Sequence, residues 1–372
     1  MENEPNIIAL GLMSGTSLDA IDLAVISSDG QGEVEPLAFE ATPLSSGLRA
    51  DISKMISRAQ SGGIDWAHDP EVAHLTAHVT EAHILATSHF LDKHRLSVSL
   101  IGFHGQTVWH DPDNGITVQL GDGQGMADAL GIQVVDQFRI ADVAAGGQGA
   151  PLVPLYHAAL CDELSGPIAI LNIGGVSNVT YIGERLNGLP QLLAFDTGPG
   201  NALINDWMKE HLDLEYDPNG AYAQKGNVSY PIIQMLMADP YFSLSPPKSL
   251  DRNRFVPKPL MVDLSVEDGA ATLTSFSVSA VIAAQAYFPN PVQRWIICGG
   301  GRYNNTIMSG LSEALDGEVV ACDTLGWQGD AIEAQAFAYL AIRTMRGFVT
   351  SIPETTGAKY GVHGGRLSKP RP

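Results

Sequence analysis

The sequence predicts an α/β protein of two domains. Its 372 residues are enough for two domains of ordinary size, and 45% of them are hydrophobic, which is a globular composition. Short apolar runs that end in glycine alternate with stretches of helical periodicity, and this alternation is typical of α/β folds. The first apolar run also has a counterpart about one domain length later in the chain.

The expected elements follow from these patterns in chain order. Asp69 is the expected N-cap of the first long helix, because Pro70 occupies the first helical position. We expect buried strands, each leading into a glycine turn, at residues 100–108, 169–182, 192–200 and 295–301, and helices at 69–94, 201–212 and 330–345.

Two segments share one plan. ALGLMSGTSLDAIDLAVI (residues 9–26) and AILNIGGVSNVTYI (169–182) both read as a strand, a turn of glycine and hydroxyl residues, and a second strand. We interpret them as one unit used twice, so that two similar domains each present such a turn, at Gly15 and at Gly175, to one ligand. The alternative is coincidence, because glycine-rich hairpins are common.

Composition and charge exclude several classes of partner. The net charge is −20, so nucleic acid and anionic membranes are not expected to bind. No stretch of about 20 apolar residues indicates a membrane span, and the acidic start MENEPN is unlike a signal peptide. Cys161, Cys298 and Cys322 have no paired spacing. These features together predict a cytoplasmic protein.

The turn GTSLDAID has the composition of a phosphate site. Backbone N–H groups and hydroxyls at Gly15, Thr16 and Ser17 can approach an anion closely, and Asp19 and Asp22 can hold hydrated Mg²⁺. The alternative is a plain polar hairpin turn. A G-x-x-x-x-G-K-[ST] loop, a G-x-G-x-x-G fingerprint and a G-x-S-x-G elbow are all absent from the sequence.

Two carboxylates are candidates for catalysis. Asp196 ends the strand LLAF, before a turn and a helix whose expected N-cap is Asn201 and whose N-terminus can bind phosphate. Such a rigid position suits a general base. Its alternative role is to cap its own turn. Glu333 opens the helix DAIEAQAFAYLAIR in line with Phe337 and Leu340, where it can face a cleft or complement the helix dipole.

Three further polar residues are candidates for substrate binding. Arg139 and Asp142 precede the glycine-rich stretch 146–149, and Arg139 can hold a carboxylate or sugar hydroxyls. A surface ion pair is the alternative. His104, at a strand end in FHGQT, either lines the substrate cleft or is a satisfied core histidine.

Seven motifs in order resemble those of the anhydro-N-acetylmuramic acid kinase family. They are GLMSGTSLDAID, FHGQTVWH, DVAAGGQGAPLVP, LNIGGVSN, FDTGPGN, CGGG and DAIEAQAFAYLA, and they cover residues 11 to about 343. The family belongs to the superfamily of sugar kinases, actin and chaperone ATPases. The resemblance therefore implies an α/β protein in which two related domains of the actin-like ATPase (sugar kinase) fold surround an ATP cleft. We expect the domains at residues 1–141 with about 345–372, and at 142–344.

The resemblance also implies the reaction and the partners. The family kinase opens the internal bridge of 1,6-anhydro-N-acetylmuramic acid with water and phosphorylates the freed O6, which gives N-acetylmuramic acid 6-phosphate and ADP. ATP and Mg²⁺ are the implied cofactors, and the anhydro sugar is the implied small-molecule partner in cell-wall recycling. The sequence leaves the oligomeric state open, with a homodimer as one expectation.

The family roles carry over to particular residues. Asp196 matches the base that activates water against the anomeric carbon, and Glu333 matches a carboxylate of the substrate cleft. The substrate contacts are assigned to His104, Gln106, Arg139 and Asp142. The cofactor contacts are assigned to Gly15, Thr16, Ser17, Leu18, Asp19, Ala20, Ile21, Asp22, Gly175, Gly198, Gly299, Gly300 and Gly301, of which Asp19 and Asp22 are also the metal ligands.

The chain departs from the family pattern in three places. Ala20 stands where glycine is frequent, and FRIAD lacks the second arginine of F-R-R-x-D. In the loop PPKSLDRNRF (246–255), Leu250 and Asp251 replace the usual Thr and Gly. The competing functions are a kinase for another sugar, which would deprotonate a hydroxyl rather than activate water, and a nucleotide-dependent binding or filament ATPase of the same superfamily.

Overall fold

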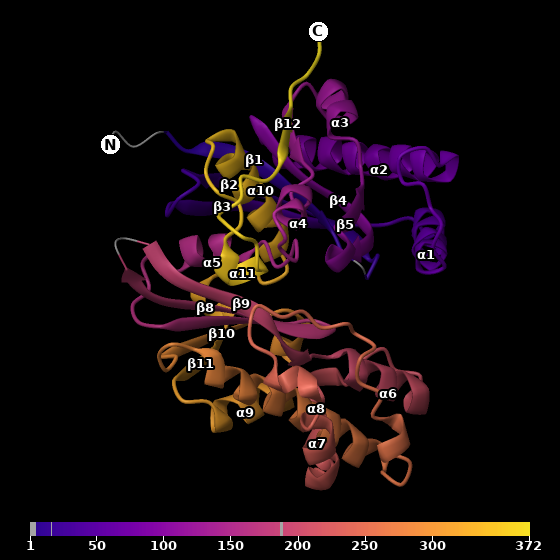
Figure 1. Ribbon diagram of the computed structural model, residues 1–372, viewed down its shortest axis with the longest axis vertical. Helices are drawn as coiled ribbons and strands as arrows, with labels where there is room; N and C mark the ends of the chain where they lie inside the picture. Colours follow the sequence, from indigo (N-terminus) through magenta and orange to yellow (C-terminus); the bar gives the residue numbers. More distant parts are fainter. Residues whose placement is uncertain (1–4, 16, 187–188) are drawn as a thin grey trace. The chain divides into compact units, whose positions relative to one another are not determined.

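The computed structural model describes residues 5–15, 17–186 and 189–372 (Figure 1). The chain divides into two compact units, which we call unit 1 (Met1–Glu163 and Ala331–Pro372) and unit 2 (Leu164–Asp330). These boundaries differ from the expected ones, because α5 (Pro154–Leu160) and α10 (Ile332–Met345) both belong to unit 1. The Tyr156 hydroxyl of α5 donates to the Gln335 side chain of α10 (2.9 Å), which ties the two helices together.

The two sheets share one core topology. In unit 1 the order is β12-β6-β4-β1-β2-β3, with β5 paired to β4, and in unit 2 it is β11-β10-β7-β8-β9. In each unit, three consecutive antiparallel strands are followed by two strands parallel to the first of them. The duplication predicted from the two similar segments is therefore confirmed, and the α/β class with two related domains is confirmed with it.

The bounds of the elements in unit 1 are as follows. The strands are β1 (Ile7–Ser14), β2 (Ala20–Ser28), β3 (Val34–Pro43), β4 (Leu100–Asp111), β5 (Ile116–Leu120), β6 (Gln133–Asp136) and β12 (Arg366–Ser368). Besides α5 and α10, the helices are α1 (Ser46–Gln60), α2 (Pro70–His94), α3 (Gly123–Leu130), α4 (Ile140–Ala144) and α11 (Pro353–Thr356).

Unit 2 contains five strands and four α-helices among the described residues. The strands are β7 (Ile168–Ile173), β8 (Val176–Leu186), β9 (Leu189–Pro199), β10 (Arg294–Cys298) and β11 (Glu318–Ala321). The helices are α6 (Ala202–Leu212), α7 (Tyr230–Met237), α8 (Val266–Ala284) and α9 (Asn305–Ala314).

Helices cover both faces of the sheet in unit 1. Leu10 and Leu12 of β1 point to the face that α2 covers, and they share one hydrophobic core with Val79 of that helix. The opposite face meets α10 at two glycines. A Cβ on Gly11 would lie 1.8 Å from the Ala334 carbonyl oxygen, and one on Gly102 would lie 2.1 Å from the Phe337 carbonyl oxygen. The helix backbone therefore rests directly on the sheet backbone, which only glycine permits.

The core of unit 2 contains a long apolar helix that the sequence analysis did not single out. Residues 266–287, which include α8, are long and apolar enough to cross a membrane, with a mean hydropathy of 1.3, but 67% of the apolar window is buried inside the protein. Leu273 and Phe276 of α8 pack in the same core as Leu171 and Ile297 of the sheet. The burial of α8 in the core explains its apolar composition.

Two local predictions at helix starts have different outcomes. Asp69 caps α2 as predicted, and its carboxylate accepts the N–H groups of Glu71 and Val72. Asn201 does precede α6, but its side chain donates to the Ile173 carbonyl oxygen (3.0 Å) and makes no capping bond. The Asn201 side chain was expected to cap α6, but it instead binds the end of β7, which lies close in space.

Candidate active site

The turn between β1 and β2 is held from two directions. The Leu18 N–H donates to the Gly15 carbonyl oxygen (3.2 Å), and Leu18 has a left-handed backbone (φ 59°). The Gln106 side chain, which is 1% exposed, donates from β4 to the same carbonyl oxygen (3.2 Å). A left-handed leucine needs support from its surroundings, and such strain gathers at functional sites. Thr16, predicted to contact phosphate, lies outside the described residues.

Gln106, a predicted substrate contact, is buried beside the Gly15 turn. Its amide nitrogen also donates to the Thr107 carbonyl oxygen (3.2 Å), whereas its oxygen Oε1 is buried without a partner among the described groups. Gln106 therefore holds the Gly15 turn against β4. A buried acceptor without a donor is costly to leave unsatisfied.

The predicted cofactor glycines divide into two groups by what surrounds them. A Cβ on Gly15 or Gly175 would meet nothing closer than 3.7 Å or 3.6 Å, and one on Gly300 nothing closer than 3.9 Å. None of these three has a positive φ. Neither packing nor backbone conformation in the described residues requires glycine there, so each leaves open space for a ligand to approach the backbone.

The other three glycines are explained by the fold. A Cβ on Gly198 would lie 2.5 Å from the Ala280 Cβ, and one on Gly301 would lie 2.3 Å from Ile173. Gly299 has φ 71°, and its Cβ would overlap Asn172. These contacts are sufficient to require glycine without a ligand.

The two predicted metal ligands differ in their surroundings. Asp19 is exposed beside the turn, and its backbone carbonyl oxygen accepts the Leu44 N–H (3.1 Å). Asp22 is half-buried on β2, opposite Met13 in the strand pairing. Among the described residues, no cluster of three or more His, Cys, Asp or Glu side chains could hold a metal by itself. An exposed carboxylate beside an open glycine turn fits Mg²⁺, which takes one or two carboxylates and the rest from phosphate and water.

His104 and Arg139 form a pair with fixed donors and acceptors. His104 is 3% exposed, and desolvation holds the pKa of its imidazole well below the usual range, so the ring is neutral. Its Nδ1–H donates to the Gly105 carbonyl oxygen (2.7 Å), which leaves Nε2 to accept from Arg139 Nε (3.0 Å). The ring also packs on Phe337 of α10, with centroids 4.5 Å apart. His104 is thus a satisfied histidine that orients Arg139.

Arg139 keeps its charge in this setting. A second hydrogen bond runs from its NH1 group to the Gly149 carbonyl oxygen (2.7 Å). Desolvation lowers the pKa of Arg139 to about 10, against the opposing charges of Glu333 and Asp142, so the guanidinium is protonated at neutral pH. Glu333 is exposed in the first turn of α10. Unit 1 therefore presents a fixed cation near an exposed carboxylate.

Asp142 has a structural place rather than the predicted contact with substrate. It is 0% exposed, and its Oδ2 accepts the Gly149 N–H (2.7 Å). Its Oδ1 accepts the Thr356 hydroxyl (2.7 Å) and the Ser351 hydroxyl. Both carboxylate oxygens are engaged by the chain itself. Asp142 holds the glycine-rich stretch that carries the carbonyl group to which Arg139 donates.

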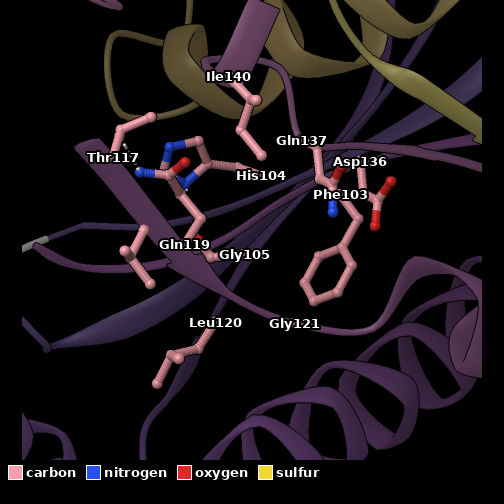
Figure 2. Close-up of a pocket in the computed structure, with 11 residues that line it drawn as sticks. Phe103, His104, Gly105, Thr117, Gln119, Leu120, Gly121, Asp136, Gln137 and Ile140 are labelled. Atoms are coloured by element: carbon pink, nitrogen blue, oxygen red, sulfur yellow. Dashed lines mark hydrogen bonds between the residues drawn. The ribbon is translucent and has the colours of Figure 1, made fainter. Parts of the chain in front are cut away.

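A pocket of about 120 Å³ adjoins His104 in unit 1 (Figure 2). Gln119 lies beside His104 in it, and Gln137 lies near Asp136 at the other end. Gln137 is left-handed (φ 56°), a conformation that is uncommon outside glycine. Sequence reasoning missed both glutamines, although Gln137 lies two residues before Arg139. The lining residues are Phe103, His104, Gly105, Thr117, Val118, Gln119, Leu120, Gly121, Asp136, Gln137 and Ile140.

Asp196 lies on β9 of unit 2 and is held at three points. Its Oδ2 accepts the Leu250 N–H (2.7 Å), its own N–H donates to the Lys248 carbonyl oxygen (3.0 Å), and its carbonyl oxygen accepts the Tyr241 hydroxyl (2.6 Å). Burial raises the pKa of the Asp196 carboxyl to about 6, and the Leu250 hydrogen bond opposes this rise. A carboxylate that is fixed in direction and titrates near neutrality is suited to accept a proton.

The backbone N–H groups that follow Asp196 were expected to bind phosphate, but they are hydrogen-bonded within the protein. The strand pairing shifts by one residue here, since Asn178 faces Asp196 while Ser177 faces Gly198, so Thr197 is an extra residue in β9. The chain then turns into α6, whose first N–H groups were expected to bind phosphate. The N–H groups of residues 200–202 instead donate to the Gly174 and Gly175 carbonyl oxygens at 2.7–3.2 Å, so this first part of the helix N-terminus is already occupied.

The comparisons with known proteins identify the family. The family model of anhydro-N-acetylmuramic acid kinase matches residues 7–369. The chain belongs to the anhydro-N-acetylmuramic acid kinase family. The anhydro-N-acetylmuramic acid kinases of Rhizorhabdus wittichii and Zymomonas mobilis are each 44% identical to it, over 98% and 97% of this chain and 99% of each relative. Among solved structures, component A of the (R)-2-hydroxyglutaryl-CoA dehydratase of Acidaminococcus fermentans covers 91% of this chain and 99% of its own, at 13% identity and a TM-score of 0.47.

Proposed function

We propose that this chain is an ATP-dependent kinase that opens 1,6-anhydro-N-acetylmuramic acid with water and phosphorylates the freed O6. The products are N-acetylmuramic acid 6-phosphate and ADP. Family membership over residues 7–369 supports the substrate and the reaction. The structural observation that carries the proposal is Asp196, a fixed carboxylate whose pKa of about 6 suits it to accept a proton from water.

Asp196 acts as the general base in this proposal. It accepts a proton from the water that attacks the anomeric carbon, while the C1–O6 bond breaks and O6 becomes the nucleophile toward the γ-phosphorus. The Leu250 N–H already takes one lone pair of Oδ2, so Oδ1 is the proposed acceptor of the proton. One base then serves two bond changes, and the remaining catalysis is positioning and charge stabilisation.

Unit 1 supplies the positive charge that is proposed to pair with the carboxylate of the sugar. The substrate carries a lactyl carboxylate, and an acidic protein must place a cation beside it. Arg139 is the proposed partner, because His104 and Gly149 fix its orientation and it remains protonated. Glu333 is the proposed second carboxylate of the sugar site, where it can accept a hydrogen bond from a sugar hydroxyl.

The open glycines are the proposed contacts for the nucleotide. Gly15 and Gly175 would let phosphate oxygens approach backbone N–H groups, and Gly300 would lie against the adenosine. Asp19 and Asp22 would hold Mg²⁺, which neutralises phosphate charge when it is bound. We assign the reaction to the cytoplasm, and the buried free thiols Cys161, Cys298 and Cys322 suit a reducing compartment. A homodimer stays a prediction.

Product analysis in labelled water tests the function. Purified protein with Mg²⁺·ATP is offered the anhydro sugar, free N-acetylmuramic acid or no sugar, and ADP release is followed by a coupled assay. We expect turnover with the anhydro sugar alone, and ¹⁸O from water at the anomeric oxygen. Turnover with the free sugar would indicate an ordinary sugar kinase, whereas ADP release without sugar would indicate an ATPase.

The rate should depend on pH through Asp196. The carboxyl must be ionised to accept a proton, and its pKa is about 6, so kcat should fall below about pH 6 and approach a tenfold loss per pH unit well below it. Above pH 7 the base is ionised and kcat should reach a plateau. A plateau that extends unchanged to pH 5 in a kcat–pH profile would contradict this assignment.

Gly15→Ala should impair ATP use without affecting the fold. The added methyl group meets no protein atom closer than 3.7 Å, and Gly15 has no positive φ, so the free energy of unfolding should be unchanged. The methyl would occupy the space proposed for phosphate, and we expect the KM for ATP to rise by about 10-fold or more, the size of one lost charged hydrogen bond.

Gly47→Ala is the matched control for this change. A Cβ on Gly47 has nothing within 4 Å, and the residue lies in α1. Its KM for ATP should match the wild type, and its thermal midpoint should be unchanged or slightly higher, because alanine suits a helix better than glycine. Equal KM values for the Gly15 and Gly47 variants would remove Gly15 from the nucleotide site.

A further inference from the structure

The loop between α7 and α8 contacts Asp196 at two backbone points. Lys248 supplies the carbonyl oxygen that accepts the Asp196 N–H (3.0 Å), and Leu250 supplies the N–H that donates to Asp196 Oδ2 (2.7 Å). The loop thus contacts β9 through two backbone groups, one of which donates to a carboxylate oxygen of Asp196. Its sequence, PPKSLDRNRF, departs from the family pattern at Leu250, yet the contact uses only a backbone group that almost any residue provides.

The Lys248 side chain anchors this loop. Its ammonium lies 4.7 Å from the ring centroid of Tyr241, 4.6 Å from that of Tyr287 and 5.8 Å from that of Phe195. It also donates to the Tyr241 carbonyl oxygen (3.1 Å). No carboxylate in the described part of the chain forms an ion pair with Lys248. The hydrogen bond to Tyr241 and cation–π attraction together hold the lysine, and the cation–π attraction is stronger where the ammonium is partly desolvated.

Tyr241 connects the anchor to Asp196. It lies in the short 3₁₀ helix η4 (Pro240–Ser243) and is 1% exposed. Its hydroxyl donates to the Asp196 carbonyl oxygen (2.6 Å), and its ring is one wall of the Lys248 cage. The same residue thus fixes the backbone of β9 at Asp196 and the loop that reaches the Asp196 side chain.

We propose that Lys248 and Tyr241 are positioning residues for the reaction. The aromatic cage holds Lys248, the anchored loop sets the Leu250 N–H on Asp196 Oδ2, and Oδ1 is left free to face the attacking water. This inference rests on the proposed role of Asp196 as the base.

Loss of the anchor has a chemical consequence beyond stability. A hydrogen bond to an ionised carboxylate favours the ionised form, so the Leu250 N–H holds the pKa of Asp196 down while burial raises it. If the loop is released, the pKa of Asp196 rises further and the base is protonated at a higher pH. A purely structural role for Lys248 would lower the thermal midpoint without moving the pH profile.

The experiment compares kcat–pH profiles of four variants. Lys248→Met keeps the length of the side chain and removes its charge. It should move the acid limb, which is the fall of kcat at low pH, upward by about one pH unit. At pH values below the limbs of both proteins, its kcat should be lower than that of the wild type by up to about tenfold. The KM values for ATP and for sugar should stay within about twofold. Lys248→Arg, which retains a cation for the cage, should restore most of the shift. Tyr241→Phe, which removes only a hydroxyl, should move the limb in the same direction.

Lys225→Met is the matched control. Its ammonium lies 5.6 Å from the Tyr222 ring centroid, in the same unit but without contact to Asp196. The control should leave both the limb and kcat unchanged. An unshifted limb in folded Lys248→Met overturns the inference. If that variant does not fold, an unshifted limb in Tyr241→Phe overturns it.

A titration in the resting protein separates this inference from the proposed function. The ¹³C carboxyl resonance of Asp196, identified by its loss in Asp196→Asn, reports the pKa without turnover. A higher pKa in Lys248→Met supports the inference even if the wild type does not phosphorylate the anhydro sugar, which would reject only the function. An unchanged pKa together with full wild-type turnover rejects the inference and leaves the function intact.

Discussion

Asp196→Asn is expected to remove nearly all turnover while the protein stays folded. The amide is close in shape to the carboxylate, and its oxygen can still accept the Leu250 N–H that the carboxylate accepts at 2.7 Å. It cannot accept a proton from water, and general-base catalysis contributes about 10²–10⁴-fold to the rate. The loss should fall on kcat rather than on KM, because the proton moves only in the transition state.

The stability of this variant provides an independent check. Burial raises the pKa of Asp196 from 3.8 to about 6, so its contribution favours the fold at low pH and is lost as pH rises through about 6. A neutral amide does not carry the cost of a buried charge, and the thermal midpoint at pH 7.5 should be at least that of the wild type. Calorimetry and single-turnover assays measure the two effects. Turnover like that of the wild type would move the role of base to Glu333.

Gly11→Ala should destabilise unit 1 more than any ordinary surface change. The new Cβ would lie 1.8 Å from the Ala334 carbonyl oxygen and 2.6 Å from the Ala338 nitrogen, so α10 must shift away from β1. Overpacking of a tight core costs about 1–3 kcal/mol and occasionally more, and we expect about 3 kcal/mol of lost unfolding free energy, or roughly 6–12 °C in the thermal midpoint.

The displaced helix also carries Glu333 in its first turn and Phe337 against the His104 ring. Gly11→Ala should therefore raise the KM for the anhydro sugar in the fraction that remains folded. Gly47→Ala again serves as the control, with its thermal midpoint unchanged or slightly higher because alanine suits a helix better than glycine. A thermal midpoint equal to that of the wild type in Gly11→Ala would mean that β1 and α10 do not touch as described.

Strands, turns and the long helices could be predicted because their signals are local. The apolar runs before Gly15 and Gly175 each specify a strand and a turn through neighbouring residues. The plan that the two segments share correctly indicated that the two units have the same core sheet topology. The Asp69 cap of α2 was predictable for the same reason, since a cap involves only the next three residues. The family motifs likewise depend on order along the chain alone.

The roles of the polar side chains depended on contacts between distant parts of the chain. His104 and Arg139 are 35 residues apart, and only their hydrogen bond shows that the histidine orients the arginine. Asp142 is separated by more than 200 residues from Ser351 and Thr356, which occupy its carboxylate. The sequence alone could not distinguish a buried structural aspartate from a substrate ligand.

The sequence by itself determined the α/β class, the duplicated strand-turn-strand plan and the family, and it singled out Asp196 as the candidate base, because hydrophobic period and motif order are properties of short segments. Only the tertiary structure decided that α10 and Glu333 belong to unit 1, that Gly15 is open whereas Gly198 is packed, and that a loop 54 residues away holds Asp196. These features follow from which faces pack together, and packing joins residues whose separation along the chain carries no local signal.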